Sequence, residues 1–275
     1  MTYSPYLLDA IIREYCPKNR DKLFSYLEDS YEHVSFSKSK WNIQDFSYDC
    51  LLSEVHYSWW IKPLQEWEQD APYFCAILPS DAKKHLMGIL SIKTHEIEEK
   101  SAQDFLKQTL ISTLGTIPIP AEYLPESLMR ILLKLSKKQL IFLIDYLAMY
   151  DLAFELKHIV DTNILKPLFS FLDKKETAFV KNLSTSLDPF SLGRIHLEKW
   201  DKQENSLRQL LHKKGIFRLS IALHNESKDL LWHIAHRLDV GRGSLLLKGY
   251  ESPVAVSITD SIQASIIELV EGENF

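Results

Sequence analysis

The clearest pattern of hydrophobic and polar positions lies in residues 133–183. Apolar residues recur there at spacings of three and four, which is the period of an amphipathic helix. Each apolar run follows a Ser, Thr or Asp, whose side chain can accept a hydrogen bond from the free N–H groups of a first helical turn. The predicted starts are Ser136, Asp151, Asp161 or Thr162, and Asp173, which has Glu176 three residues later. The stretch therefore predicts short stacked helices, as in armadillo-like folds.

The remaining chain also has a largely helical pattern. In the first part, helices are expected at residues 5–16, 21–31 and 96–114, with a polar loop at 35–42. Residues 83–92 are compatible with either a helix or a short buried strand, and the pattern leaves both open. The fold class predicted is mainly α, with two helical lobes and at most a minor β element.

Further capping signals predict the helices of the last third of the chain. Asp and Ser residues, a capping-box pair and a proline at a first turn favour helix starts, whereas glycines favour helix ends. The predicted starts are Asp188–Pro189, Asp201 with Glu204, Ser227, and Ser257 or Asp260; the predicted ends are Gly215 and Gly241. Residues 242–253 are expected to form a loop.

A break in the helical pattern divides the chain. Gly115 is followed by Pro118, Pro120 and Pro125, and three prolines within so short a stretch cannot continue a helix. We expect residues 116–126 to link an N-terminal lobe of residues 1–115 to a C-terminal lobe of residues 127–275.

Composition and charge narrow the class of protein. Hydrophobic residues make up 45% of the 275 residues and only 8 are glycine, which favours a packed helical protein. The formal net charge is −5, and the acidic excess lies in residues 1–115, with 17 Asp and Glu against 12 Lys and Arg. Without a basic stripe, the chain is expected to bind neither nucleic acid nor anionic membrane surfaces.

The cysteines and the apolar runs predict a cytoplasmic location. Cys16, Cys50 and Cys75 are odd in number and far apart, which predicts buried reduced thiols in place of a disulfide framework or zinc site. The N-terminus lacks the pattern of a signal peptide. No apolar run approaches the about 20 residues that a membrane-spanning helix needs.

Aromatic residues are concentrated between residues 41 and 74, where four of the six tryptophans lie before residue 68. Because Trp and Tyr are enriched at binding hot spots, the candidate protein-binding residues are Tyr57, Trp59, Trp60 and Trp67. The alternative is that these side chains form a core. Adjacent helical residues point about 100° apart. Of Trp59 and Trp60, only one is therefore a good candidate for exposure.

Candidate chemistry is sparse. Asp229, His233, His236 and Asp239 share roughly one helical face and could in principle bind zinc, but no ligand from a second element is evident. The chain contains neither a P-loop nor a nucleophile elbow. We therefore predict no catalytic, metal or cofactor site, and a protein that is not an enzyme.

One segment resembles a known family. Residues 151–157, D-L-A-F-E-L-K, resemble the D-L-A-x-x-L-K of the C-terminal half of the flagellar motor-switch protein FliG. As in that family, a helix of the form L-x-x-L-(L/I) precedes the phrase, at residues 140–144. A further helix at 168–172 and a charged helix start at 173–176 follow it. The resemblance covers about a fifth of the chain.

A second family is more similar over the whole chain. FliG proteins carry several charges around the helix before this phrase, whereas residues 141–149 have one, Asp145. The length, the helical content, the aromatic-rich first half and residues 219–243 are similar to the SctK (YscK-like) accessory proteins of type III secretion systems. That family belongs to the cytoplasmic sorting platform beneath the injectisome.

The resemblance to SctK implies a non-enzymatic scaffold. It would link the cytoplasmic domain of the inner-membrane ring protein SctD to the SctQ-type pod protein, and reach the stator SctL and the secretion ATPase indirectly. The protein would be peripheral to the bacterial inner membrane, held there by its partners, and would need no cofactor. A flagellar switch-like component and an enzyme or regulator with an unrecognised site remain as alternatives.

Overall fold

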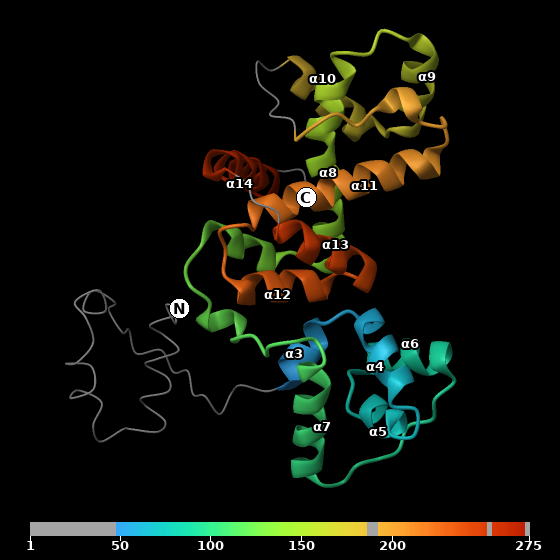
Figure 1. Cartoon of the computed structure of the whole chain (residues 1–275), viewed down its shortest axis with the longest axis vertical. Helices are drawn as coiled ribbons and strands as arrows, with labels where there is room; N and C mark the ends of the chain where they lie inside the picture. The colour runs from blue at the N-terminus through green and yellow to red at the C-terminus, as the bar shows by residue number, and fades with distance from the viewer. Residues whose placement is uncertain (1–47, 186–191, 252–254, 273–275) are drawn as a thin grey trace, which may run out of the picture. The chain divides into compact units, whose positions relative to one another are not determined.

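The computed structural model describes residues 48–185, 192–251 and 255–272 (Figure 1). In these ranges the chain forms α- and 3-10 helices joined by turns and loops, with no β-strand. The mainly α fold class is therefore confirmed. The predictions for residues 5–16, 21–31, 35–42 and Asp188–Pro189, and for Cys16, lie outside the described residues.

The chain divides into two compact units. Among the described residues, unit 1 consists of residues 48–126 and 227–239, and unit 2 of residues 127–185, 192–226, 240–251 and 255–272. The first boundary, after Glu126, coincides with the end of the linker expected at 116–126. The proline-rich residues nevertheless belong to unit 1. Residues 227–239, expected in the C-terminal lobe, also belong to unit 1.

Unit 1 is built from short helices. Its elements are α3 (Tyr48–Glu54), η4 (Tyr57–Trp60), α4 (Ile61–Glu66), α5 (Ala71–Ala76), α6 (Ser80–Leu90), α7 (Lys100–Ser112), η5 (Ala121–Tyr123) and α12 (Lys228–Arg237). The ambiguous residues 83–92 are thus largely helical, within α6. The helix expected from residue 96 begins only at Lys100, and residues 91–99 before it have no regular structure.

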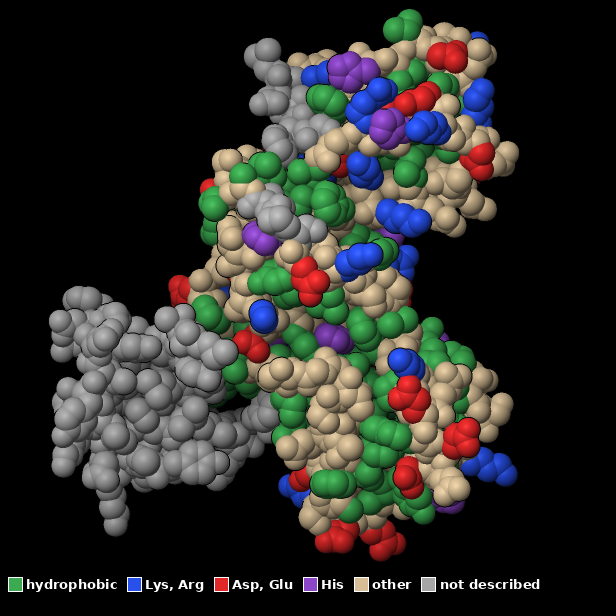
Figure 2. Space-filling model, in the orientation of Figure 1, with side chains coloured by type: hydrophobic (Ala, Val, Ile, Leu, Met, Phe, Trp, Pro, Cys, Tyr) green, Lys and Arg blue, Asp and Glu red, His purple; other side chains and the backbone are tan. Residues whose placement is uncertain are grey.

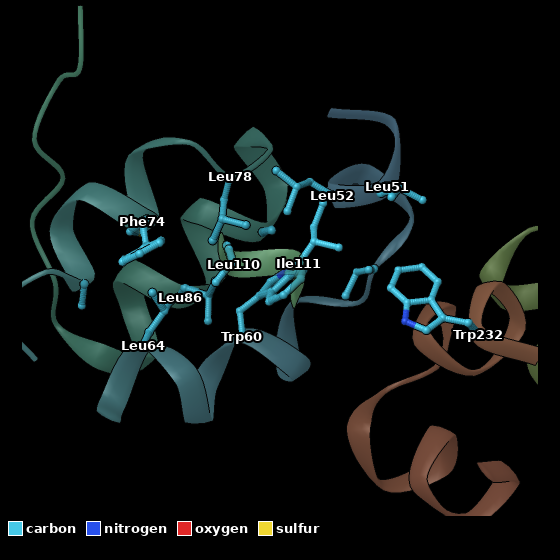
Figure 3. Packing of buried hydrophobic residues seen from close by; sticks show 14 residues of the cluster. Leu51, Leu52, Trp60, Leu64, Phe74, Leu78, Leu86, Leu110, Ile111 and Trp232 are labelled. Carbon is cyan, nitrogen blue, oxygen red and sulfur yellow. The ribbon is translucent and has the colours of Figure 1, made fainter. Parts of the chain in front are cut away.

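Large apolar side chains fill the interior of unit 1. Figure 3 shows the indole of Trp60 among Leu86, Leu110 and Ile111, and Trp232 of α12 belongs to the same cluster. Cys75 is also buried in this core, whereas Cys50 on α3 is exposed, so the expectation of buried cysteines is wrong for Cys50. Because residues from α3 to α7 and from α12 share one core, unit 1 folds from two separated stretches of the chain.

Unit 2 contains two long helices and several shorter ones. Its elements are η6 (Leu128–Lys134), α8 (Lys137–Leu156), α9 (Thr162–Phe171), α10 (Lys174–Thr185), η7 (Leu197–Lys199), α11 (Glu204–Ala222), α13 (Val240–Tyr250) and α14 (Val256–Glu271). In Figure 1, α9 and α10 lie toward one end of α8, which α11 crosses. Apolar residues of α8 to α11 form the core of this part.

Three of the four predicted starts in residues 133–183 are confirmed. Ser136 and Asp161 cap α8 and α9 by accepting hydrogen bonds from Gln139 N and Asn163 N. Asp173 and Glu176 form the reciprocal capping box of α10, at 2.7 and 2.9 Å. Asp151 is the exception, because α8 continues through it as one helix of 20 residues. Two short helices were expected where one long helix forms.

Gly215 has a packing role that differs from the predicted one. It lies inside α11, where a Cβ atom would come within 1.8 Å of the Ile144 carbonyl oxygen of α8. Only a residue without a side chain lets the two helix backbones approach this closely. The prediction that Gly215 ends a helix is therefore wrong, because the glycine serves a helix crossing.

The later capping signals have mixed outcomes. Ser227 caps α12, accepting a hydrogen bond from Leu230 N at 3.1 Å, as predicted. Asp201 accepts bonds from Gln203 N and Ser206 Oγ, so it shapes the turn before α11 without forming the expected box with Glu204. Gly241 lies inside α13, and residues 242–250, expected as a loop, continue that helix. The last helix, α14, forms, but it begins at Val256 after Ala255, so neither Ser257 nor Asp260 is its cap.

Candidate protein-binding site around Tyr57 to Trp67

The aromatic stretch begins at a capped turn. His56 Nδ1 accepts a hydrogen bond from Ser58 N at 3.2 Å and starts the 3-10 helix η4, which leads directly into α4. The tight turn directs Trp59 and Trp60 to different surroundings. Trp60 is 0% exposed, and its indole N–H makes no hydrogen bond in the described structure. Trp59 is half-buried.

The four candidate residues therefore differ in access. Trp60 is a core residue, so its assignment as a protein-binding residue is corrected: no partner could reach it without unfolding the unit. Tyr57 is half-buried and stacks on the exposed His85, with ring centroids 4.6 Å apart. Trp67, also half-buried, packs on Phe74 at 4.2 Å. Tyr57, Trp59 and Trp67 keep exposed edges, and we name these three residues the aromatic edge.

Trp59 lies against α12. Its indole N–H donates a hydrogen bond to the Leu238 carbonyl oxygen at 2.9 Å, and its ring packs on His236 at 4.4 Å. The ring of Trp232 packs on the same imidazole at 4.3 Å. His56 N also donates to the His236 carbonyl oxygen at 2.8 Å. The turn at residues 56–59 is therefore attached to the C-terminal end of α12 by backbone and side-chain contacts.

The two histidines of α12 have opposite protonation preferences. Burial by itself lowers the pKa of His233, but hydrogen bonds to Glu54 and the Ile119 carbonyl oxygen, and the charges of Glu54 and Asp229, together raise it above its usual value. For His236, burial lowers the pKa from 6.5 to about 4, with the charge of His233 acting in the same direction. Of this adjacent pair, His233 favours the charged form and His236 the neutral form.

Three of the four residues considered as zinc ligands make hydrogen bonds within unit 1. Asp229 accepts a hydrogen bond from Ile119 N at 3.2 Å, and His233 binds Glu54 and Ile119. His236 Nδ1 bonds to the Trp232 carbonyl oxygen at 2.9 Å. In the part of the chain that the structure describes, no three His, Cys, Asp or Glu side chains are grouped to hold a metal ion.

Sequence reasoning missed a buried ionic cluster in unit 2. Asp151, 1% exposed, accepts two hydrogen bonds from Arg218 at 2.9 and 3.0 Å and a third from Leu192 N. One turn further along α8, the buried Glu155 accepts bonds from Arg194 and Ile195 N. Through these bonds, Asp151 and Glu155 connect α8 to the segment at residues 192–195, and Asp151 also connects it to α11. The available signal was a pair of acids four residues apart in a largely apolar part of the helix.

The two units carry opposite formal charges. The described residues of unit 1 contain 8 Lys and Arg against 14 Asp and Glu, a formal charge of −6. Those of unit 2 contain 18 against 14, a formal charge of +4. Unit 1 also exposes large apolar side chains, including Phe105 at 66% and Ile89 at 53%. In Figure 2, acidic and apolar side chains lie side by side over the visible face of this unit.

Comparison with known proteins adds no relative. No protein-family model matches the chain, and neither the curated proteins nor the solved structures searched contain a match. Within the described ranges, none of the helices has the length and apolar character needed to cross a membrane.

Proposed function

We propose that this protein is a non-enzymatic helical scaffold that holds two protein partners, one on each unit. The observation that carries this proposal is the division of charge: two separately packed units, formally −6 and +4, belong to one chain. Surfaces of opposite sign favour partners of opposite sign, because charge complementarity steers encounter and disfavours like-charged partners. One chain with two such units is suited to joining a basic partner to an acidic one.

The contacts of the polar side chains support a structural role over a catalytic one. The buried acids Asp151 and Glu155 bind arginines and backbone N–H groups within unit 2. His233 is bound through both ring nitrogens within unit 1. Groups that are fully used in holding helices together contribute rigidity, which a scaffold between larger assemblies requires.

The assembly that we propose is the sorting platform of a type III secretion system. The support is the resemblance of residues 219–243 and of the aromatic-rich first half to SctK proteins. The partners would be the cytoplasmic domain of an SctD-type ring protein and an SctQ-type pod protein, with SctL and the ATPase further along. The protein would then act in the cytoplasm, at the inner membrane through its partners.

The aromatic edge gives a test of the contact on unit 1. Tyr57→Ala should weaken binding of the partner of unit 1 about 30-fold, because truncating an anchoring aromatic residue typically costs about 2 kcal/mol or more. Binding should also weaken as salt is raised, since the unit is acidic. Titration calorimetry with each candidate partner measures both effects, and the melting temperature shows that the variant is folded.

Phe105→Ala is the control, because it removes an exposed aromatic ring of unit 1 that lies outside the aromatic edge. We expect it to bind like the unsubstituted chain. Normal binding by a folded Tyr57→Ala variant would exclude the aromatic edge as the contact. Equal loss in both variants would mean that the contact is not specific to it.

A further inference from the structure

His233 is positioned to carry a proton on both ring nitrogens. It is 1% exposed, with Nδ1 2.8 Å from Glu54 Oε2 and Nε2 2.9 Å from the Ile119 carbonyl oxygen. Both neighbours are hydrogen-bond acceptors. A neutral imidazole has a single N–H and can satisfy only one of them, whereas an imidazolium satisfies both. Loss of the proton would therefore leave a buried acceptor without its donor, which is costly.

The same helix binds both backbone polar groups of Ile119, its N–H and its carbonyl oxygen. Asp229 Oδ1 accepts a hydrogen bond from Ile119 N at 3.2 Å, one turn of α12 before His233 contacts the Ile119 carbonyl oxygen. Together with Glu54 on α3, these contacts tie α12 to two other segments of unit 1. The charged groups around the imidazolium are Glu54 from α3 and Asp229 from α12, and the adjacent titratable group is His236. Arg237 also lies within the electrostatic influence of Glu54.

His236 must be neutral in the same arrangement. Its ring lies between the indoles of Trp59 and Trp232, at 4.4 and 4.3 Å, and is 3% exposed. A charge there would be desolvated with no acidic partner among its described hydrogen bonds. The docked helix therefore requires one charged and one neutral histidine, three residues apart.

We propose that α12 is a proton-controlled clasp of unit 1, closed when His233 is protonated and His236 is neutral, and opened by a pH change in either direction. Opening would break the contacts to Glu54 and Ile119 and uncover the indole rings of Trp59 and Trp232. The clasp would set the stability of the contacts between residues 227–239 and residues 48–126, the two stretches of unit 1.

The direction of each effect follows from proton linkage. The pKa of His233 is raised in the closed state, so its stabilising effect is complete below 6.5 and is lost as the pH rises through the raised value. The pKa of His236 is lowered to about 4, so closure weakens as the pH falls from 6.5 towards 4. The clasp should be tightest near pH 6.5. Opening should increase about tenfold per pH unit as the pH falls from 6.5 towards 4, and it should also increase as the pH rises through the raised pKa of His233.

Hydrogen–deuterium exchange of peptides from residues 227–239 in the full chain, corrected for intrinsic rates, tests this. We expect protection to peak near pH 6.5 and to fall on both sides. Glu54→Gln keeps an acceptor but removes the charge, so it should move the alkaline fall to lower pH. Glu98→Gln, an exposed carboxylate of the same unit, should leave the profile unchanged.

Imidazole nitrogen NMR on the unsubstituted chain provides a readout that does not depend on any variant. His233 should keep protons on both nitrogens above pH 6.5, while His236 stays neutral down to about pH 4. Protection of α12 that does not vary with pH would overturn the proposal. So would a His233 that titrates at or below 6.5, or a Glu54→Gln profile identical to that of the unsubstituted chain.

Discussion

Asp151→Ala is expected to lower the free energy of unfolding of unit 2 by about 3–5 kcal/mol. The substitution leaves the guanidinium of Arg218, itself 1% exposed, without its carboxylate in a dry interior. It also removes the acceptor of Leu192 N, and so loosens the segment at residues 192–195. The neighbouring ring of Tyr150, 5.3 Å from the guanidinium carbon, cannot replace a full negative charge. Urea denaturation followed by helical circular dichroism measures the loss.

Two controls separate a buried ion pair from a charge effect in general. Glu66→Ala breaks the exposed pair with Lys62 and should change stability by no more than about 0.5 kcal/mol. The double variant Asp151→Leu with Arg218→Met leaves no lone buried charge, so it should be more stable than Asp151→Ala alone. A cost below about 1 kcal/mol for Asp151→Ala would show that the pair does not hold unit 2 together.

Leu152→Ala is expected to cost about 2–5 kcal/mol, because it leaves a cavity in a fully packed part of unit 2. Leu152 is 0% exposed and lies in the core cluster formed by α8, α9, α10 and α11. Leu156, at the end of the same helix, is only partly buried. The sequence pattern placed it in a separate short helix that would start at Asp151.

Leu156→Ala is therefore the matched control, with the same chemical change four residues away. It should cost clearly less than Leu152→Ala, since its surroundings can relax and water can reach part of the site. Denaturation of the two variants under identical conditions measures the difference. Equal losses would mean that α8 is buried evenly to its last turn, contrary to the structure.

Local signals in the sequence identified much of the fold. The spacing of apolar residues located the helical segments of α8 to α10, although it divided α8 in two, and the reciprocal pair Asp173 and Glu176 marked the start of α10. These features involve residues within one or two turns of each other, so the sequence contains both partners. The mainly α class follows from them.

Long-range contacts explain what the sequence could not reveal. Asp151 has the chemistry of a helix cap, but it is satisfied by Arg218, 67 positions later, and so it can lie within a helix. Gly215 resembles a helix end because glycine commonly follows the last turn of a helix. Its actual role depends on the carbonyl oxygen of Ile144, which belongs to another helix and excludes a side chain. Neither partner can be recognised from the local sequence.

In the candidate site, too, the local features could be predicted from the sequence and the distant contacts could not. The adjacency of Trp59 and Trp60 correctly predicted that one would be buried and the other more accessible. The sequence also showed that His233 and His236 lie on roughly one face of a predicted helix. Their partners were not, because Glu54 is 179 positions from His233 and Ile119 is 114 positions away. These contacts, and the place of Trp232 in the core, accompany the inclusion of residues 227–239 in unit 1.

We propose that one chain holds two different partners at once. Sedimentation velocity of the full chain mixed with an SctQ-type pod protein and the cytoplasmic domain of an SctD-type ring protein tests it most directly. The proposal predicts one complex that contains all three proteins and that does not form when the chain is left out. Displacement of one partner by the other, binding of only one partner, or no association with either would contradict it.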